Sequence, residues 1–336
     1  MDFLTKIKEL YNNKNISDYH LRSGGNFAYR ELGEVLTIPD IKITEKNILS
    51  FLESNCKKEE VDQFKNTNEL DCAIVIDDKR FRANFYNTFK GPALVMRKIE
   101  TEIPKMDNLN LPPILFSLLD EHKGLVLVTG PTGSGKSTTL AAIINEINEN
   151  RKANIITVED PIEYVHLDKQ SIISQREVGK QTKNFASALK AALREDPDVI
   201  LVGELRDLET VSLALTAAET GHLVFGTLHT SGAPDTINRI IDVFPSDQQP
   251  QIRAQIAQSL KMVVTQKLFK KKDGKGRVGA FEVMTANAPV KNLIRENKIH
   301  QITSVMQTAQ REGMITMEKS IEGLVATGEI DNPGSE

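Results

Sequence analysis

The chain has 336 residues, of which 40% are hydrophobic and 26% are charged, a composition typical of folded globular proteins. This length is sufficient for two domains that each have a core. The net charge of −4 argues against a dedicated nucleic-acid-binding protein, because such proteins usually carry a strong basic excess. The two cysteines, Cys56 and Cys72, exclude a disulfide framework and a tetracysteine zinc site.

Residues 1–100 are predicted to form a smaller N-terminal domain of short helices and strands. Apolar residues at helical spacing over residues 1–12 predict an amphipathic helix and not a signal peptide. Segments 70–76 and 80–86 predict neighbouring strands, joined by a polar turn at residues 77–79. No apolar run approaches the roughly 18 residues that span a membrane, so we expect a cytoplasmic protein without a transmembrane segment.

A linker is predicted at residues 101–113, which hold three prolines among Asn and Asp residues. Beyond it, strands and helices alternate, and this order predicts a parallel sheet covered by helices over residues 114–288. The predicted strands are 125–129, 154–158, 199–202 and 223–227, and the predicted helices are 137–150, 185–193 and 208–220. From residue 289 to residue 336 the pattern is helical.

One segment matches the phosphate-binding pattern G-x-x-x-x-G-K-[ST]. Its residues are Gly130, Pro131, Thr132, Gly133, Ser134, Gly135, Lys136 and Ser137, and Thr138 follows. Glycines let backbone N–H groups approach phosphate oxygens, Lys136 would reach the β- and γ-phosphates, and Ser137 would hold Mg²⁺. A flexible turn is the alternative, but the apolar strand before the segment and the amphipathic helix after it favour ATP binding.

Two acidic segments follow predicted strands. Residues 159–163 bring three carboxylates within five positions, and we expect Glu163 to orient or deprotonate the attacking water. Residues 198–204 end in Glu204, which we expect to hold Mg²⁺ or to bridge to it. The alternative for each segment is a solvated acidic turn.

Two histidines and three arginines complete the candidate site. His222 and His229 bracket a predicted strand, and His229 follows its C-terminal end, where ligands bind in open α/β sheets. A structural role is the alternative for both. Arg80 and Arg82 alternate along one face of a predicted strand and Arg97 comes later, so they either lie on a solvated face or act as arginine fingers on the γ-phosphate of a neighbouring subunit.

Together these motifs resemble the secretion ATPase superfamily of bacterial type II secretion and type IV pili. The resemblance covers almost the whole chain. It includes the phosphate loop, the acidic box at 159–163, the Walker B-like segment ending at Gly203 and Glu204, and the histidine box at 221–230. The segments 174–179, 191–198 and 239–245 are also similar to the family.

Two features favour the pilus retraction ATPases within that superfamily. Assembly and secretion ATPases carry a tetracysteine zinc insertion where this chain has only residues 270–275, and residues 288–296 resemble a C-terminal motif of the retraction family. The chain departs from the family at Val290-Lys291, at Tyr19 and at Asp235, and Gly203 stands where many relatives have an Asp.

The resemblance implies a homo-hexamer with a PAS-like N-terminal domain and a RecA-like ATPase core. It also implies that Mg-ATP hydrolysis drives pilus retraction and twitching motility through an inner-membrane platform protein. Such a motor would lie peripherally at the inner face of the cytoplasmic membrane, without zinc or nucleic acid. The alternatives are an assembly ATPase, a DNA translocase and a non-catalytic regulatory subunit.

Overall fold

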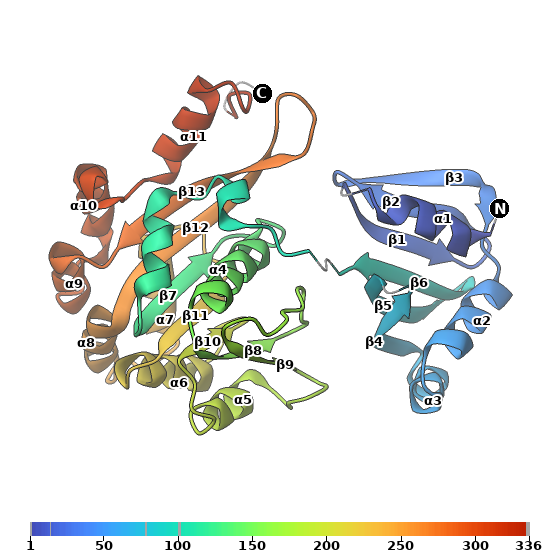
Figure 1. Cartoon of the computed structure of the whole chain (residues 1–336), viewed down its shortest axis with the longest axis horizontal. Coiled ribbons are helices and arrows are strands. Elements are labelled where there is room, and N and C mark those ends of the chain that lie inside the picture. The colour runs from blue at the N-terminus through green and yellow to red at the C-terminus, as the bar shows by residue number, and fades with distance from the viewer. Residues whose placement is uncertain (1, 14, 78, 100–101, 334–336) are drawn as a thin grey trace. The chain divides into compact units, whose positions relative to one another are not determined.

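A computed structural model of the chain describes residues 2–13, 15–77, 79–99 and 102–333 (Figure 1). The chain divides into two compact units, Met1–Glu102 and Ile103–Glu336. The predicted boundary at 100/101, Asp78 of the predicted turn, Met1 of the predicted first helix and the last three residues of the predicted helical region lie outside the described residues. Among the described residues, no helix has both the length and the apolarity that crossing a membrane requires.

The N-terminal unit is a six-stranded antiparallel sheet with helices packed against it. The strand order is β3-β2-β1-β6-β5-β4. The elements are α1 (Phe3–Tyr11), β1 (Ile16–Arg22), β2 (Asn26–Glu31), β3 (Glu34–Lys42), α2 (Glu45–Asn55), α3 (Lys58–Thr67), β4 (Glu69–Ile76), β5 (Lys79–Thr88) and β6 (Gly91–Lys98). The predicted helix at the N-terminus and the two predicted neighbouring strands are therefore confirmed as α1, β4 and β5.

The core of this unit follows from period-2 patterning. Along β4 buried and exposed residues alternate, so that Leu70, Cys72 and Ile74 enter the core while the residues between them face outward. The Sγ atoms of Cys72 and Cys56 lie 3.5 Å apart, which is a contact between free thiols.

The C-terminal unit is built on a seven-stranded sheet in the order β13-β12-β7-β11-β10-β8-β9. Its strands are β7 (Gly124–Thr129), β8 (Asn154–Glu159), β9 (Ile172–Glu177), β10 (Val199–Val202), β11 (Leu223–Leu228), β12 (Leu260–Lys270) and β13 (Arg277–Thr285). All neighbouring pairs are parallel except β12 and β13, whose connecting turn contains most of the lysine-rich segment 270–275.

Helices cover both faces of this sheet (Figure 1). The α-helices are α4 (Lys136–Asn150), α5 (Phe185–Ala192), α6 (Leu208–Glu219), α7 (Ala233–Asp242), α8 (Gln249–Ser259), α9 (Ala288–Arg295), α10 (Ile302–Thr308) and α11 (Met317–Ala326). The 3-10 helices are η1 (Met106–Leu109), η2 (Pro113–Asp120), η3 (Ile299–Gln301) and η4 (Gln310–Glu312).

Strand β7 shows why the unit has three layers. Its residues are all buried, and they alternate between two cores. Leu125 and Leu127 pack with α5 to α10, whereas Val126 and Val128 pack with α4, η1 and η2. A strand that is apolar on both faces needs helices on both sides, and this is typical of parallel sheets. The predicted α/β fold class is confirmed.

Both ends of the C-terminal unit pack into its hydrophobic cores. Met106 and Leu111, in the predicted linker, are buried against α4 and the sheet, so this part of residues 101–113 belongs to the folded unit. Val290 and Ile294 of the predicted helical region are fully buried in the same core as α6 and α8. Their side chains pack α9 into the core of the C-terminal unit.

Candidate functional site

The phosphate loop joins β7 to α4 and approaches β12 very closely. Gly130 and Gly135 have φ angles of +138° and +89°, which side chains rarely adopt. A Cβ at Gly130 would overlap the Gln266 carbonyl oxygen, and one at Gly135 would lie 2.7 Å from Gln266 Nε2. Backbone conformation therefore favours glycine at both positions, and at Gly130 the Gln266 carbonyl oxygen also leaves no space for a side chain.

Strand β12 supports the loop with buried polar contacts. Thr139 Oγ1 donates to Gln266 Oε1 at 2.8 Å, and the hydroxyls of Thr129 and Thr265 lie 2.9 Å apart. All four side chains are buried. Because buried polar groups are costly to leave unpaired, these contacts hold the loop in one arrangement.

Lys136 is the charged group of the loop. Its Nζ donates to the carbonyl oxygens of Gly130 at 2.7 Å and Pro131 at 3.1 Å. Burial lowers the pKa of Lys136 below its ordinary value, and the negative charges of Glu204 and Glu163 act in the opposite direction. The fold therefore brings three of the five residues that the sequence assigned to catalysis close enough to interact electrostatically.

A cavity of about 90 Å³ opens beside the loop. Ser137, Glu163 and Glu204 all line it. Ser134 Oγ is buried in the loop and makes no hydrogen bond with any described residue. This hydroxyl is therefore suited to form a hydrogen bond with a polar group of a ligand. A hydroxyl and carboxylates are hard oxygen donors of the kind that Mg²⁺ prefers, so the residues present fit Mg-ATP.

Glu204 follows the C-terminal end of β10. Its carboxylate lies 2.5 Å from the Arg206 guanidinium and 3.5 Å from His229 Nε2. Burial raises the pKa of Glu204, but Arg206 and His229 outweigh it and bring the pKa below its ordinary value. A Cβ at Gly203 would lie 3.1 Å from the Val158 carbonyl oxygen, so a side chain at this position would require a small shift of β8.

Glu159 ends β8 beside the same cavity. Its carboxylate accepts hydrogen bonds from Thr157 Oγ1 at 2.7 Å and Gln175 Nε2 at 3.1 Å. Burial raises the pKa of Glu159 to about 7, although these hydrogen bonds oppose the shift. This carboxyl therefore changes its protonation near neutral pH.

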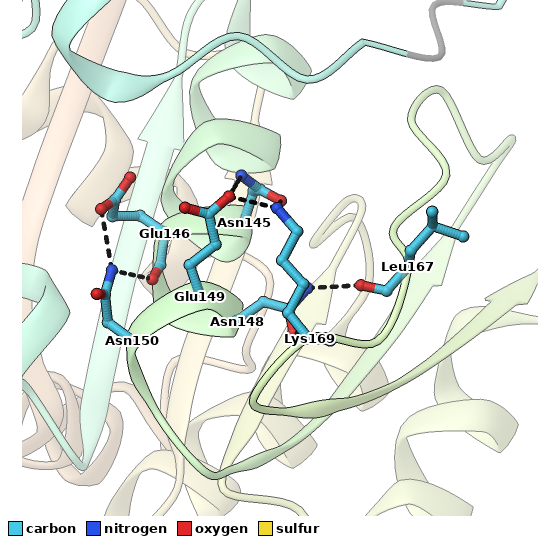
Figure 2. A network of polar contacts seen from close by, with 7 residues as sticks. All are labelled: Asn145, Glu146, Asn148, Glu149, Asn150, Leu167 and Lys169. Carbon is cyan, nitrogen blue, oxygen red and sulfur yellow. Dashed lines mark hydrogen bonds and ion pairs between the residues drawn. The ribbon is translucent and has the colours of Figure 1, made fainter.

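The segment 160–171, here called the acidic loop, joins β8 to β9 and carries Glu163. Asn148 of α4 anchors its return (Figure 2). Asn148 Nδ2 donates to the Leu167 carbonyl at 2.8 Å, and its Oδ1 accepts from the Lys169 backbone N–H at 3.1 Å. Lys169 Nζ also contacts Glu149 and Asn145 of α4. Helix α4 therefore follows the phosphate loop at its N-terminal end and holds the acidic loop near its C-terminal end.

His222 is not brought to this site. It precedes β11, whereas His229 follows the same strand, so the two residues lie at opposite edges of the sheet. His222 Nδ1 contacts the Ala217 carbonyl at 2.9 Å and Thr220 Oγ1 at 3.2 Å. His222 does not line the cavity, and this geometry favours the structural alternative, so a catalytic role for His222 stays a prediction.

The three arginines belong to the N-terminal unit, where two of them have acidic neighbours. Arg82 pairs with Asp71 at 2.5 Å, and Arg97 Nε donates to Asp18 at 2.8 Å. Arg80 and Arg82 alternate along β5 as predicted. Their part in nucleotide binding stays a prediction.

Several residues that shape the site were not predicted from the sequence. Tyr164 and Arg206 line the cavity, Gln175 contacts Glu159, and Gln266 supports the phosphate loop. Two of these residues could have been found from their distance to known motifs. Arg206 follows Glu204 by two residues, and Gln175 lies in a segment that resembles the family. No local pattern pointed to Gln266, which lies 130 residues after Lys136 in the chain.

The phosphate loop, the parallel sheet and the carboxylates at its strand ends define a P-loop ATPase with a RecA-like core. A family model described as "Type II/IV secretion system protein" matches residues 66–332. The chain belongs to this family.

Particular relatives are similar over much or nearly all of the chain. A "Twitching motility protein" of Neisseria gonorrhoeae is 57% identical over 251 residues, covering 75% of this chain and 67% of the relative. The "Type IV pilus retractation ATPase PilT" of Pseudomonas aeruginosa is 43% identical, covering 97% and 95%. A structure described as "Crystal Structure of the Pilus Retraction Motor PilT and Bound ADP" has a TM-score of 0.89 and 44% identity, covering 98% and 94%.

Proposed function

We propose that this chain is the ATPase motor of type IV pilus retraction and that it hydrolyses Mg-ATP at the phosphate loop. The observation that carries the enzymatic part is the cavity beside the loop, because Ser137, Glu163 and Glu204 converge there from three separate segments. The names of the similar relatives support the biological part, because they describe twitching motility and pilus retraction.

The residues divide the work of phosphoryl transfer. Backbone N–H groups of the loop and the Lys136 ammonium bind the phosphates and stabilise the charge that develops on them. Ser137 and Glu204 are placed to hold Mg²⁺, which when bound neutralises phosphate charge. Glu163 orients the attacking water or takes its proton. Arg206 and His229 keep Glu204 ionised, because they lower its pKa against the effect of burial.

The assembly is part of the proposal. We expect six copies in a ring at the inner face of the cytoplasmic membrane, acting on a platform protein there. Arg80, Arg82 and Arg97 are proposed to contact nucleotide in such a ring. Mass photometry of the purified chain with nucleotide would test the ring, and a monomer at all concentrations would contradict it.

Two substitutions test the enzymatic part. We expect Lys136→Ala to abolish ATP turnover, because no other loop side chain supplies the positive charge. Glu204→Ala should keep ATP binding and lower kcat by roughly 100-fold or more, as for the loss of one preorganised charge interaction. Steady-state hydrolysis and binding of a fluorescent ATP analogue separate the two results. Wild-type turnover by Lys136→Ala would overturn the site.

A deletion in the bacterium that carries this chain tests the biological part. Retraction predicts excess surface pili and loss of twitching, and complementation by the Lys136→Ala variant should fail to restore motility. Cells without pili would favour an assembly ATPase, because assembly and retraction have opposite effects on pilus number.

A further inference from the structure

Two side chains of β9 contact the backbone of the acidic loop. Gln175 and Glu177 are two positions apart, so they lie on the same face of the strand. Gln175 Nε2 donates to the Tyr164 carbonyl at 2.9 Å, and its Oε1 accepts from the His166 backbone N–H at 2.8 Å. Glu177 Oε2 accepts from the Ile162 backbone N–H at 3.3 Å.

These contacts fall on both sides of Glu163. Ile162 and Tyr164 are its immediate neighbours, so their backbone groups determine where the Glu163 side chain leaves the loop. The Tyr164 hydroxyl also lies 3.0 Å from Oγ1 of Thr138, the residue of α4 that directly follows Ser137. The loop around Glu163 is thus positioned with respect to the phosphate loop.

Each polar atom that holds the loop is itself fixed. Gln175 Nε2 makes its second contact with Glu159 Oε1 at 3.1 Å, so both of its N–H groups can be used. Glu177 Oε1 pairs with Lys180 Nζ at 2.5 Å, which leaves Oε2 for the Ile162 N–H. The Glu177 side chain is only 12% exposed, so solvent competes weakly for it.

We infer that Gln175, together with Glu177, is a positioning residue for Glu163 in ATP hydrolysis. The inference rests on the proposed function, in which Glu163 acts on the attacking water. Neither side chain lines the cavity, so each acts on Glu163 through the loop backbone, although Gln175 also contacts Glu159, which does line the cavity. A loosened loop lets Glu163 leave the productive geometry, and displacement of a catalytic group by about 1 Å can lower a rate by up to 10²-fold.

The position of Gln175 predicts which kinetic constant changes. The phosphate loop is held by β7, α4 and β12, and none of those contacts involves β9. Loss of the Gln175 contacts should therefore lower kcat and leave KM and nucleotide affinity almost unchanged. A loss of general stability would change both.

Gln175→Met tests the inference, because methionine keeps the length of the side chain and lacks its hydrogen-bonding groups. We expect kcat to fall about tenfold or more, with KM and binding of a fluorescent ATP analogue within about twofold of wild type. Ser174→Ala is the matched control, because Ser174 is the exposed neighbour on the opposite face of β9, and it should keep wild-type kcat. Wild-type kcat in Gln175→Met would overturn the inference.

Variants at Glu177 provide a conservative comparison. Glu177→Gln retains an oxygen that accepts from the Ile162 N–H and should keep kcat within about threefold of wild type. Glu177→Leu removes that acceptor and should reduce kcat severalfold with KM unchanged. Equal losses in the two variants would assign the effect to the Lys180 ion pair and would overturn the part given to the Ile162 contact.

A double-mutant cycle with Glu163→Gln separates positioning from a structural role. If Gln175 acts through Glu163, Gln175→Met should have almost no further effect on kcat in the Glu163→Gln background. An undiminished effect there would overturn the inference alone. Wild-type turnover by Glu163→Gln itself would overturn the proposed role of Glu163 and with it the inference, so the two failures are distinguishable.

Discussion

The phosphate loop and the acidic loop border the same cavity but are held by different kinds of contact. The phosphate loop lies so close to β12 that a Cβ at Gly130 would overlap the Gln266 carbonyl oxygen, and the supporting side chains are buried. Residues 160–171 contact β9 and α4 mainly through hydrogen bonds between their own backbone groups and side chains of those elements. The first arrangement depends on space and the second on polar groups that can be removed one at a time.

This difference suits the two tasks. Phosphate binding needs a fixed set of backbone N–H groups, and close packing keeps them fixed. Activation of water needs one carboxylate at a suitable distance, and a few hydrogen bonds suffice to place it. Mutations should accordingly have abrupt effects in the phosphate loop and graded effects in the acidic loop.

The largest effect is expected from Gly130→Ala. The new Cβ would overlap the Gln266 carbonyl at a φ of +138°, so we expect the unfolding free energy of the C-terminal unit to fall by roughly 3–5 kcal/mol. Urea titration of the purified chain measures it. Gly133→Ala is the control, because a Cβ there meets nothing within 4 Å and the cost should stay near 1 kcal/mol. Equal costs would show that space is not the constraint.

A pH-dependent effect is expected at Glu159, where β8 meets the acidic loop. Its pKa of about 7 in the folded chain lies above the ordinary 4.5, so the folded state binds this proton more tightly. The stability from this group is present below pH 4.5 and is lost as the pH rises through 7. Relative to Glu159→Gln, wild type should lose about 3 kcal/mol between pH 4.5 and 8. Parallel denaturation curves at both pH values would contradict this.

The smallest effect is expected from Lys169→Ala. Lys169 and Glu149 are 40% and 37% exposed, so their ion pair should contribute less than about 1 kcal/mol and kcat should change less than twofold. Asn148→Ala is the comparison, because Asn148 is fully buried and its loss frees two backbone groups of the acidic loop. Thermal melting and steady-state hydrolysis measure both variants, and a larger effect at Lys169 would reverse the ranking.

Much of the fold could be predicted from sequence because its signals are local. Continuous apolar runs marked β7, β8, β10 and β11, and the phosphate loop was recognisable from eight consecutive residues. The carboxylates Glu163 and Glu204 were found because each follows such a strand. In a parallel sheet the C-terminal strand ends share one edge, so strand order was not needed to bring them together.

Contacts between distant segments could not be predicted in this way. Gln266 reaches the phosphate loop only because β12 pairs with β7, and no pattern near either strand specifies that pairing. Strand β9 was not predicted, since polar residues interrupt it, and the face shared by Gln175 and Glu177 stayed hidden with it. His222 and His229 were predicted to bracket a strand, and β11 does lie between them, but the sequence did not reveal that His222 contacts the Ala217 carbonyl.

Strand β9 lies at the edge of its sheet, and within the part of the chain that the structure describes it pairs with β8 alone. An edge strand can detach by breaking one ladder of hydrogen bonds, at a smaller free-energy cost than unfolding the whole unit. Detachment of β9 would release Glu163, while the phosphate loop, which follows β7 and is separated from β9 by the three strands β8, β10 and β11, would keep its shape. Amide hydrogen exchange should therefore be faster in β9, at residues 172–177, than in β10, at residues 199–202. During such local opening the protein would keep its bound nucleotide while ATP hydrolysis is suspended.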